Sequence, residues 1–547
     1  MATTHEVFNQ SVPLEGHDAA GLDQALIEGL MREDGEVHME DLHRVGVQAG
    51  DPARIHQGEL ANQHPPVLRT HDRFGHRIDD VEYHPAYHSL MEVAVREGLA
   101  GAPWADERPG AHVGRAAKFA VWSQVEAGHG CPISMTYSIV PALRAEPSLA
   151  EAWEPLLTST TYDPTQAPAP APGGSKVGAI AGMAMTEKQG GSDVRANTTR
   201  AAATSGATGP GEEYALTGHK WFCSAPMSDL FLMLAYTDAG LSCFAVPRWL
   251  PDGGRNAIAI QRVKDKLGNR SNASSEIELD GALARMVGDD GRGIATILTM
   301  VNHTRLDCVI GATGQMRAGF SQAIHHARNR TAFGALLVDQ PLMRNVLADL
   351  AVESEAATHL MTRLAGAYDR RESAFTRMAT AVGKYWVCKR APVFAHEALE
   401  CLGGAGYIEE APMSRLFRES PLNGIWEGSG NVICLDVLRA AAKDPDSLAA
   451  LLTEIELAAG ADGRLDRAVA DLHAELSDLE QLPFRARRIV ERLALALQAS
   501  LLLRYAPTAV ADAFCATRLA GDGGRAFGTL PAGTDVDAII DRSWPAP

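Results

Sequence analysis

The sequence predicts an α+β fold with a helical N-terminal domain, a small central β-domain, a helical bundle and an extra helical domain at the C-terminus. Three observations predict this order. Apolar residues recur at spacings of three and four in the outer parts of the chain, short alternating segments gather in the middle, and a Pro/Gly-rich stretch separates the first two regions. We therefore expect domains over residues 1–181, 182–290, 291–440 and 441–547.

Helical spacing marks the first domain at residues 87–95, 116–125 and 135–143. Polar, Pro-containing segments such as 62–67 separate these stretches, so we expect helices with long irregular connections. Residues 163–175 contain the run APAPAPGGS. Proline and glycine at this density cannot form a core, and the stretch is therefore predicted to be an exposed linker.

After this stretch the period of the apolar pattern changes. The segments 230–236, 242–246, 258–263 and 275–279 are short, often alternating, and separated by turn residues such as those at 251–254. Several strand-like segments at this spacing predict a small β-sandwich or barrel.

From Gly291 onward the helical pattern returns. Its apolar stripes cover residues 306–327, 346–368 and 375–402, and the last stripe ends at the helix-ending pair Gly403-Gly404. Long helices with short connections predict a bundle. Two or three further helices are expected in the C-terminal domain, at 448–458, 465–479 and 484–503.

Composition narrows the class of protein. The formal net charge of -18 favours solubility and argues against a wholesale polyanion binder, although it leaves room for a local basic patch. The 8 cysteines form no CxxC pair. We therefore expect no disulfide framework and no zinc or other metal site, and a reducing cell interior as the natural setting. The N-terminus lacks the features of a signal peptide, and the longest apolar run, 493–503, is too short to span a bilayer. We expect a cytoplasmic protein.

A stretch of seven residues, IWEGSGN at 425–431, carries the strongest chemical signal. Its glycines allow a ligand to approach the backbone, and Ser and Asn side chains can bond the polar edges of that ligand. The carboxylate of Glu427 could then remove a proton next to a carbonyl group. The alternative is a helix N-terminus at which Ser429 or Asn431 is the cap and Glu427 is simply solvated.

Two segments of the β region are candidates for cofactor contacts. In MTEKQGGSDV, at 185–194, paired glycines beside Thr and Ser hydroxyls leave the backbone open to a flat polar ligand; an ordinary turn is the alternative. In KWFCS, at 220–224, an aromatic platform and small polar groups lie at an expected strand end. Core packing of Trp221 is the alternative there.

Taken together, these motifs resemble those of the acyl-CoA dehydrogenase flavoproteins. The resemblance also includes KLGNRS at 266–271, RTAFG at 330–334 and LGGAGY at 402–407, and it follows the family's order over roughly residues 85–440. The N-terminal VFNQSVPL, the stretches TEKQGGSDVRANTTRA and KDKLGNRSNAS, and the added C-terminal domain are similar to the AidB-type alkylation-response proteins. That similarity spans almost the whole chain.

The resemblance implies FAD as the cofactor and assigns its contacts to two groups of residues. Those in the β region hold the flavin ring and pyrophosphate or cover the flavin face near N5: Met185, Thr186, Gly191, Ser192, Trp221, Phe222, Cys223 and Ser224. Those in the bundle line the flavin and the adenosine end: Gly403, Gly404, Trp426, Ser429 and Asn431. The residues that reach the FAD of a neighbouring subunit are Arg330, Phe333 and Gln340, which implies a dimer of dimers, a homotetramer.

Glu427 matches the family's catalytic base, and Arg305 matches an arginine near it. Physical chemistry agrees with this assignment, because removing the α-proton of a thioester needs a desolvated carboxylate on one face, and the flavin must accept the β-hydride at N5 on the other. Backbone N–H groups, including that of Glu427, can polarise the thioester carbonyl as an enolate forms. Three positions depart from the family pattern: Cys223 replaces a common Thr, Glu400 a Gln and Trp426 a Tyr.

The resemblance implies two functions. The first is an FAD-dependent oxidoreductase with weak activity on an acyl-CoA; the sequence leaves the acyl chain and the electron acceptor open. The second is a DNA-associated flavoprotein that protects against alkylation damage. For the second, Arg485, Arg488 and Arg492 share one face of a predicted helix and could contact the phosphates of double-stranded DNA. The alternative for this strip is a solvated face with salt bridges to Glu491 and other acids.

Overall fold

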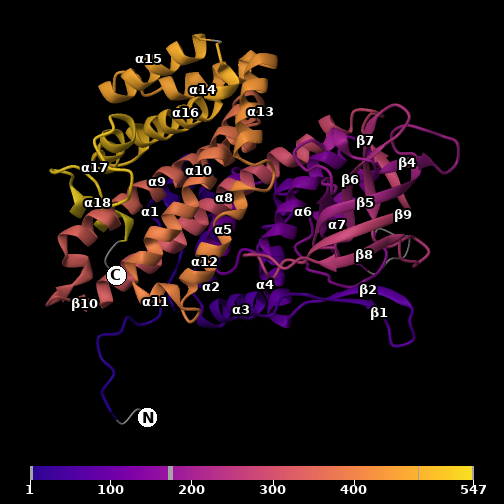
Figure 1. The fold of residues 1–547 in the computed structure, drawn as a ribbon, viewed down its shortest axis with the longest axis horizontal. Coiled ribbons are helices and arrows are strands. Elements are labelled where there is room, and N and C mark those ends of the chain that lie inside the picture. The colour runs from indigo at the N-terminus through magenta and orange to yellow at the C-terminus, as the bar shows by residue number, and fades with distance from the viewer. Residues whose placement is uncertain (1–3, 170–175, 479, 545–547) are drawn as a thin grey trace. The chain divides into compact units, whose positions relative to one another are not determined.

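Helices and one mixed sheet dominate the computed structural model, which describes residues 4–169, 176–478 and 480–544 (Figure 1). The chain forms two units, each built from separate stretches of sequence. The first consists of Met1–Pro52, His112–Gln124 and Cys308–Pro547, and the second of Ala53–Ala111 and Val125–Asp307. The predicted fold class, helical domains around a central β-domain, is confirmed.

The second unit contains a seven-stranded sheet in the order β3-β6-β4-β5-β9-β7, with β8 paired to β9. Antiparallel pairing of β6 with β7 closes the path into a barrel. The strands are β3 (Ala181–Ala184), β4 (Arg200–Ala203), β5 (Glu213–Ser224), β6 (Leu230–Tyr236), β7 (Leu241–Pro247), β8 (Ile258–Val263) and β9 (Ser274–Val287). All four predicted strand segments are therefore strands.

Apolar side chains of the strands fill the barrel, with Phe231, Phe244 and Ile277 among the buried residues of one continuous core. The pairing of β5 with β9 is irregular between Lys220 and Cys223. An irregularity of this kind bends a strand and redirects side chains, and it is common beside functional sites. It falls within the KWFCS motif.

The rest of the second unit is mainly helical: α3 (Pro52–Gln63), α4 (Pro85–Arg96), α6 (Gly130–Leu143) and α7 (Pro147–Leu157). The sequence did not predict the hairpin of β1 (Val67–His71) and β2 (Arg77–Glu82). Its first strand has no buried residue, so it lacks the apolar alternation from which strands are predicted. Asp72 holds the turn by accepting hydrogen bonds from the amides of Phe74 and His76. Residues 170–175 of the predicted linker lie outside the described residues.

Long helices form the first unit, as the bundle prediction requires. Its bundle helices are α1 (Gln24–Arg32), α2 (Met39–Ala49), α5 (Ala111–Trp122), α8 (Gly293–Asn329), α9 (Pro341–Asp369), α10 (Ser373–Cys401), α11 (Gly404–Tyr407), α12 (Pro412–Glu419) and α13 (Gly430–Lys443). The helix α8 contributes residues to both units. A short hairpin, β10 (Thr331–Ala332) with β11 (Ala335–Leu336), joins α8 to α9. Among the described residues, no helix is long and apolar enough to cross a membrane.

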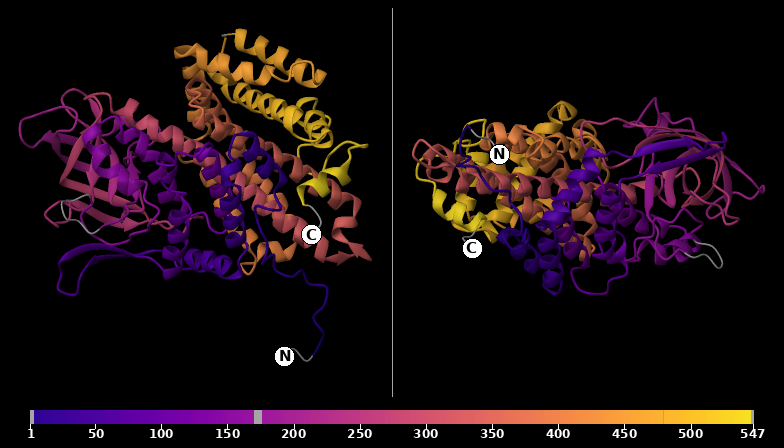
Figure 2. Two further views of the ribbon diagram at one scale, coloured as in Figure 1. Left: turned by 180° about the vertical axis from the view of Figure 1, so that it is seen from behind. Right: turned by 90° about the horizontal axis from the view of Figure 1, so that it is seen from below.

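The C-terminal helices are α14 (Pro445–Glu456), α15 (Gly463–Ser477), α16 (Leu482–Tyr505), α17 (Thr508–Phe514) and α18 (Val536–Ser543). The first three match the predicted helices, whereas α17 and α18 were not predicted. In Figures 1 and 2, α14, α15 and α16 lie side by side, and α14 and α16 pack on α10. The C-terminal segment thus belongs to the same compact unit as the bundle.

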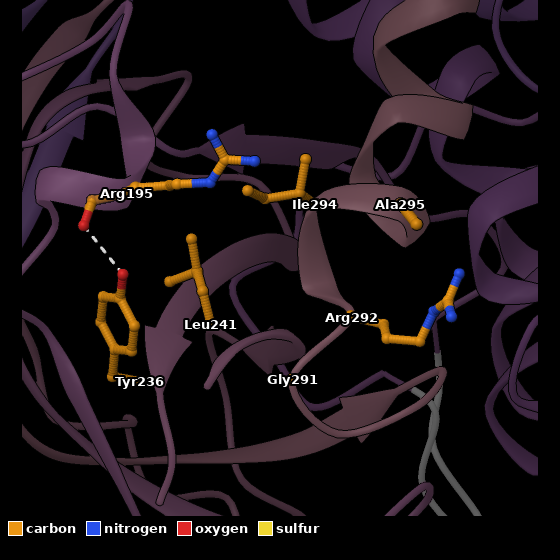
Figure 3. A pocket seen from close by; sticks show the side chains of 7 residues that line it. All are labelled: Arg195, Tyr236, Leu241, Gly291, Arg292, Ile294 and Ala295. Carbon is orange, nitrogen blue, oxygen red and sulfur yellow. Dashed lines mark hydrogen bonds between the residues drawn. The ribbon is translucent and has the colours of Figure 1, made fainter. Parts of the chain in front are cut away.

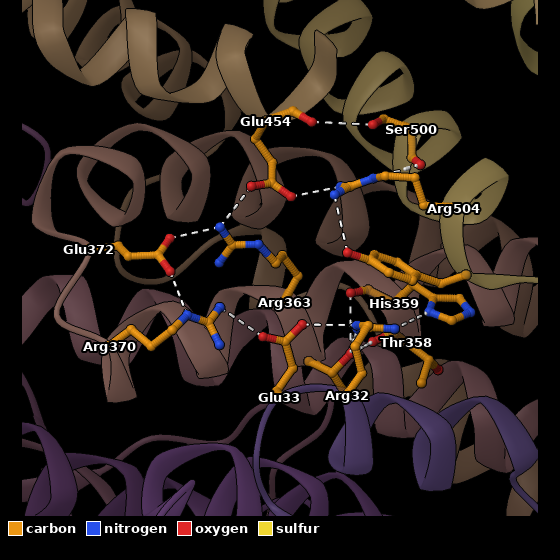
Figure 4. Close-up of polar contacts among 12 residues, drawn as sticks. Arg32, Glu33, Thr358, His359, Arg363, Arg370, Glu372, Glu454, Ser500 and Arg504 are labelled. Atoms are coloured by element: carbon orange, nitrogen blue, oxygen red, sulfur yellow. Dashed lines mark hydrogen bonds and ion pairs between the residues drawn. The ribbon is translucent and has the colours of Figure 1, made fainter. Parts of the chain in front are cut away.

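A buried network of alternating charges links these helices to the bundle (Figure 4). Arg363 of α9 donates to both Glu372 and Glu454, each at 2.7 Å. Arg504 of α16 donates to the other oxygen of Glu454 at 2.6 Å. Burial opposes ionisation of Glu454, but its bonds with the two arginines outweigh burial and lower its pKa. The network therefore ties α14 and α16 to α9 through paired charges.

Candidate active site

The two candidate cofactor segments of the β region lie next to each other in the second unit. The amide of Trp221 donates a hydrogen bond to the carbonyl of Thr186 at 2.8 Å. The ammonium of Lys220 donates to the Glu187 carboxylate at 2.9 Å. The motifs at 185–194 and 220–224 therefore form one surface of the barrel, as a shared cofactor site requires.

Glu187 has a structural role within this surface. Its carboxylate also accepts hydrogen bonds from the amide of Thr198 at 2.7 Å and the hydroxyl of Thr199 at 2.5 Å. Burial would raise the pKa of Glu187, but attraction to Lys220 and these hydrogen bonds outweigh burial and bring the pKa to about 2. A carboxylate this firmly ionised and fully bonded holds the loop in place rather than exchanging protons.

The surface formed by these motifs is open in the way that a flat cofactor needs. Gly191 is exposed, and a Cβ atom there would lie only 3.0 Å from the Thr186 methyl group, so glycine allows this close turn. Phe222 is 47% exposed, and Trp221 is half-buried. The ammonium of Lys264 lies 3.5 Å from the centre of the Trp221 ring, a cation–π contact. Met185 and Thr186 are half-buried beside them, and Ser192 and Ser224 add exposed or half-buried hydroxyls.

Cys223 differs from its neighbours because its side chain belongs to the core of the barrel. Burial raises the pKa of its thiol to about 12. The residue can offer its backbone to a cofactor, and its buried thiol stays protonated at neutral pH.

A pocket of about 300 Å³ lies elsewhere in the second unit, where the β6–β7 turn meets the start of α8 (Figure 3). Its lining is Arg195, Tyr236, Leu241, Gly291, Arg292, Ile294 and Ala295. Both arginines are exposed, and within the described residues neither takes part in an ion pair. Two guanidinium groups that have no ion-pair partner among the described residues, beside apolar side chains, can bind an anionic ligand. No sequence motif reveals this pair, because the fold brings the two residues together.

In the first unit, the IWEGSGN stretch forms a tightly held loop before α13. Glu427 has a φ of 56° and Gly428 a φ of 104°, so consecutive residues occupy left-handed backbone conformations. Such a conformation is unfavourable for a glutamate unless the surroundings hold it. Lys384 of α10 provides this hold, because its ammonium donates to the carbonyls of both Trp426, at 2.8 Å, and Gly428. Glu427 itself is half-buried.

The capping alternative for this loop is wrong for Ser429. Helix α13 begins at Gly430 with Ser429 in the cap position, but the Ser429 side chain makes no capping hydrogen bond. The side-chain oxygen of Asn431 instead accepts a hydrogen bond from Arg487 of α16 at 2.8 Å. A residue of the C-terminal helices thus reaches the candidate site, and no local sequence signal could have shown it.

The residues assigned to a neighbouring subunit's cofactor lie on or next to the β10–β11 hairpin. Arg330 donates to the backbone carbonyl of Asn9, and Gln340 donates to the carbonyl of Ala332 at 3.0 Å. Phe333, with a φ of 53°, has its side chain fully exposed. An aromatic ring held outward in this way is available to another molecule.

The remaining predicted site residues are Gly403, Gly404 and Arg305. Gly403, with a φ of 58°, and Gly404 are exposed at the end of α10, with open space around both. Arg305 lies in α8, is 5% exposed and belongs to the second unit, whereas Glu427 belongs to the first. The predicted residues thus form one set in the second unit and one in the first unit.

The arginine strip of α16 is paired with acidic residues. Arg488 and Arg492 both bind Glu475, at 2.6 and 2.8 Å, and Arg485 lies 3.3 Å from the Asp478 carboxylate. Salt bridges to acidic residues are therefore present, as the alternative interpretation expected, but their partners are Glu475 and Asp478 rather than the expected Glu491. Another face of the helix is buried, with Val490, Leu493 and Leu497 in the core.

Comparison with known proteins agrees with this architecture. Residues 9–164 match the family "Adaptive response protein AidB N-terminal domain", residues 182–282 the "Acyl-CoA dehydrogenase, middle domain" and residues 291–442 the "Acyl-CoA dehydrogenase, C-terminal domain". The fold and the motifs thus define an acyl-CoA dehydrogenase-type chain.

The chain is 45% identical to AidB of Escherichia coli (strain K12) over 531 residues, which cover 95% of each protein. It is 30% identical to acyl-CoA dehydrogenase family member 11 of Caenorhabditis elegans, over 79% of this chain and 72% of that protein. The chain therefore belongs to the acyl-CoA dehydrogenase family, in its AidB-type branch, and the predicted resemblance is confirmed.

Solved structures show the same fold along nearly the whole chain. The structure of Caenorhabditis elegans ACDH-11 in complex with C11-CoA has a TM-score of 0.84 at 25% identity, covering 100% of this chain and 94% of that one. The structure described as Bd2924 apo-form has a TM-score of 0.83 at 28% identity, covering 91% and 99%.

Proposed function

We propose that this protein is an FAD-dependent dehydrogenase that removes the α-proton and the β-hydride of an acyl-CoA thioester, with Glu427 as the base. The observation that carries the proposal is the conformation of the Glu427 loop. A glutamate is kept in a left-handed backbone conformation between two carbonyls bound by one buried lysine. An unfavourable conformation that the fold maintains in this way is typical of active sites.

The residues of the chain fit FAD, the cofactor of its family. The barrel supplies the open Gly191 turn, the Trp221 and Phe222 rings and nearby hydroxyls, which suit a flat polar ring system. The helical unit supplies Ser429 and Asn431 at the start of α13, where backbone N–H groups favour negative charge. When bound, FAD supplies the acceptor for the hydride that leaves the β-carbon.

The chain's own groups perform the proton transfer. Glu427 accepts the α-proton on its carboxylate, and the electrons of the broken C–H bond move toward the thioester carbonyl. The backbone N–H of Glu427 donates to that carbonyl oxygen as it gains negative charge. Both tasks depend on the direction in which the loop presents Glu427.

The second unit offers positive charge to the phosphates of an acyl-CoA. Arg195 and Arg292 at the 300 Å³ pocket are unpaired within the described residues, and their guanidinium groups can bind phosphate oxygens. A relative of the same fold is known in complex with C11-CoA.

The exposed ring of Phe333 supports the further proposal that the chain works as a homotetramer. Eight buried free thiols suit a reducing, cytoplasmic setting.

The experiment that tests the proposal is an anaerobic titration of the FAD-loaded protein with acyl-CoA thioesters of short, medium, long and branched chains. Bleaching of the flavin absorbance by at least one of them is expected. The matched control is the corresponding carboxylic acid, whose α-proton is far less acidic and which should leave the flavin oxidised. A protein that binds FAD but is bleached by no acyl-CoA would contradict the proposal.

Binding of double-stranded DNA by the α16 strip stays a prediction of the second hypothesis, that of a protein that protects against alkylation. The strip's three arginines face two acidic partners, Glu475 and Asp478. A phosphate that binds there must compete with these ion pairs, so affinity at this face should be low and strongly dependent on salt.

A further inference from the structure

Lys384 is a buried cation with an unusual set of partners. It lies in the middle of α10, and its side chain is 1% exposed. Its ammonium donates only to backbone carbonyls, those of Trp426 and Gly428, and among the described residues no carboxylate pairs with it. Burying an ammonium without a carboxylate partner is unfavourable, so its hydrogen bonds to the two carbonyls must be well formed.

The carbonyl that Lys384 binds is part of the peptide group that also carries the N–H of Glu427. A trans peptide is planar, and its C=O and N–H bonds point in opposite directions. When Lys384 fixes the Trp426 carbonyl toward α10, it therefore aims the Glu427 N–H away from α10. A cation on the oxygen of a peptide group also polarises that group, which makes its N–H a stronger donor.

The second bond of Lys384 fixes the far side of the left-handed pair Glu427-Gly428. The Gly428 carbonyl belongs to the peptide group between Gly428 and Ser429, so one ammonium holds the peptides on both sides of the pair. Rotation of either peptide would break a bond to a buried charge. The backbone of the loop is thus restrained in the orientation that directs the Glu427 N–H away from α10.

We propose that Lys384 is a positioning residue that aims and strengthens the Glu427 N–H as the donor to the thioester oxygen while the enolate forms. The proposal rests on the proposed function, because it needs an acyl thioester at Glu427. It assigns to α10 a part in stabilising the enolate, although Lys384 itself touches neither substrate nor cofactor. Its partners lie 42 and 44 residues away in the sequence, which is why no motif reveals it.

The test compares Lys384→Met, which keeps the length of the side chain but cannot donate, with Lys384→Gln, which can donate one hydrogen bond without charge. Lys443→Met, which removes an exposed lysine of α13, is the matched control. Each FAD-loaded variant is titrated across pH with acetoacetyl-CoA, whose enolate gives a long-wavelength band with an oxidised flavin. The rate of flavin reduction by the best acyl-CoA of the wild type is measured alongside.

With FAD content unchanged, Lys384→Met is expected to raise the apparent pKa for enolate formation by about one unit or more. Its maximal reduction rate should fall at least about tenfold, with little change in the half-saturating acyl-CoA concentration. Lys384→Gln should lie between Lys384→Met and the wild type, and Lys443→Met should match the wild type.

Wild-type enolate pKa and reduction rate in Lys384→Met would overturn the proposal and leave the proposed function intact. Loss of FAD from both Lys384 variants would assign the residue to folding alone and would also overturn it. A wild type that neither bleaches with any acyl-CoA nor forms the enolate band would overturn the proposed function, and this proposal with it.

Discussion

Two buried lysines, one in each unit, show how the same side chain serves different ends. Lys220 in the barrel and Lys384 in the helical unit are both 1% exposed, and each bonds to a backbone carbonyl. Lys220 also pairs with the Glu187 carboxylate, whereas Lys384 has a second carbonyl in that place. The first lysine has its charge balanced by a carboxylate, and the second applies its charge to the backbone around Glu427.

The different partners of the two lysines indicate where function lies in this fold. The Lys220–Glu187 pair joins the two cofactor segments of the barrel and needs no ligand to be satisfied. Lys384 holds a backbone conformation that glutamate avoids, and that arrangement is useful only if the orientation of Glu427 matters. Removing Lys220 should therefore lower the stability of the protein, whereas removing Lys384 should lower the rate of flavin reduction.

The largest effect on stability is expected for Lys220→Met. The substitution leaves the Glu187 carboxylate buried without its cation, and breaking such a pair costs about 3–5 kcal/mol. Urea unfolding followed by circular dichroism would measure the loss. The double substitution Lys220→Met with Glu187→Gln should recover much of it, since no unpaired charge is then buried. Equal stability of the single and double variants would show that the ion pair is not what Lys220 contributes.

Acid should weaken the barrel through the same pair. The pKa of Glu187 is lowered from 4.5 to about 2, so its contribution to stability is fully present above pH 4.5 and is lost as the pH falls toward 2. Unfolding free energies measured between pH 5 and pH 2 should fall more steeply for the wild type than for Glu187→Gln. If the unfolding free energies of the two proteins fall with pH in parallel, other carboxylates cause the acid sensitivity.

A smaller effect is expected at the far end of the Glu427 loop. Arg487→Ala removes the hydrogen bond to Asn431, and loss of one such bond typically costs about 0.5–1.5 kcal/mol. If Asn431 contacts FAD, the dissociation constant for FAD should rise by about twofold to tenfold, as measured by fluorescence titration of the apoprotein. Arg488→Ala, one position along and paired with Glu475, is the matched control. Identical FAD affinities in both variants would show that Asn431 does not contact the cofactor.

The smallest effect concerns double-stranded DNA and belongs to the second hypothesis. Replacing Arg485, Arg488 and Arg492 by Ala removes three positive charges, of which Glu475 and Asp478 already balance two. The slope of log affinity against log salt should therefore flatten by about one phosphate contact at most, with FAD content unchanged. Fluorescence anisotropy with a labelled duplex would measure it. An unchanged slope would rule out this strip as the DNA contact.

Much of the fold could be predicted because its elements carry strong periodic patterns. The strand β6 has the predicted bounds of residues 230–236, and the stripes of α8, α9 and α10 mark helices that are long and mostly buried. The hairpin of β1 and β2 carries no apolar alternation, and the short helices α17 and α18 offer too few turns to show a period.

The candidate site was predictable only in its local parts. The motifs around Glu187, Trp221 and Glu427 are contiguous in sequence, and each forms a compact local structure. Lys384 and Arg487 join the Glu427 loop from other helices, and the fold alone brings them there. Chemistry supplied by neighbouring residues can be found in a sequence, whereas support from distant residues needs the structure.

The most direct test of the central claim is the rate of flavin reduction in Glu427→Gln, measured anaerobically by stopped flow with the best acyl-CoA of the wild type. The amide keeps the size of the side chain but cannot accept the α-proton, so the rate should fall by about a hundredfold to ten-thousandfold while FAD stays bound. Equal rates in the two proteins would contradict the claim that Glu427 is the base.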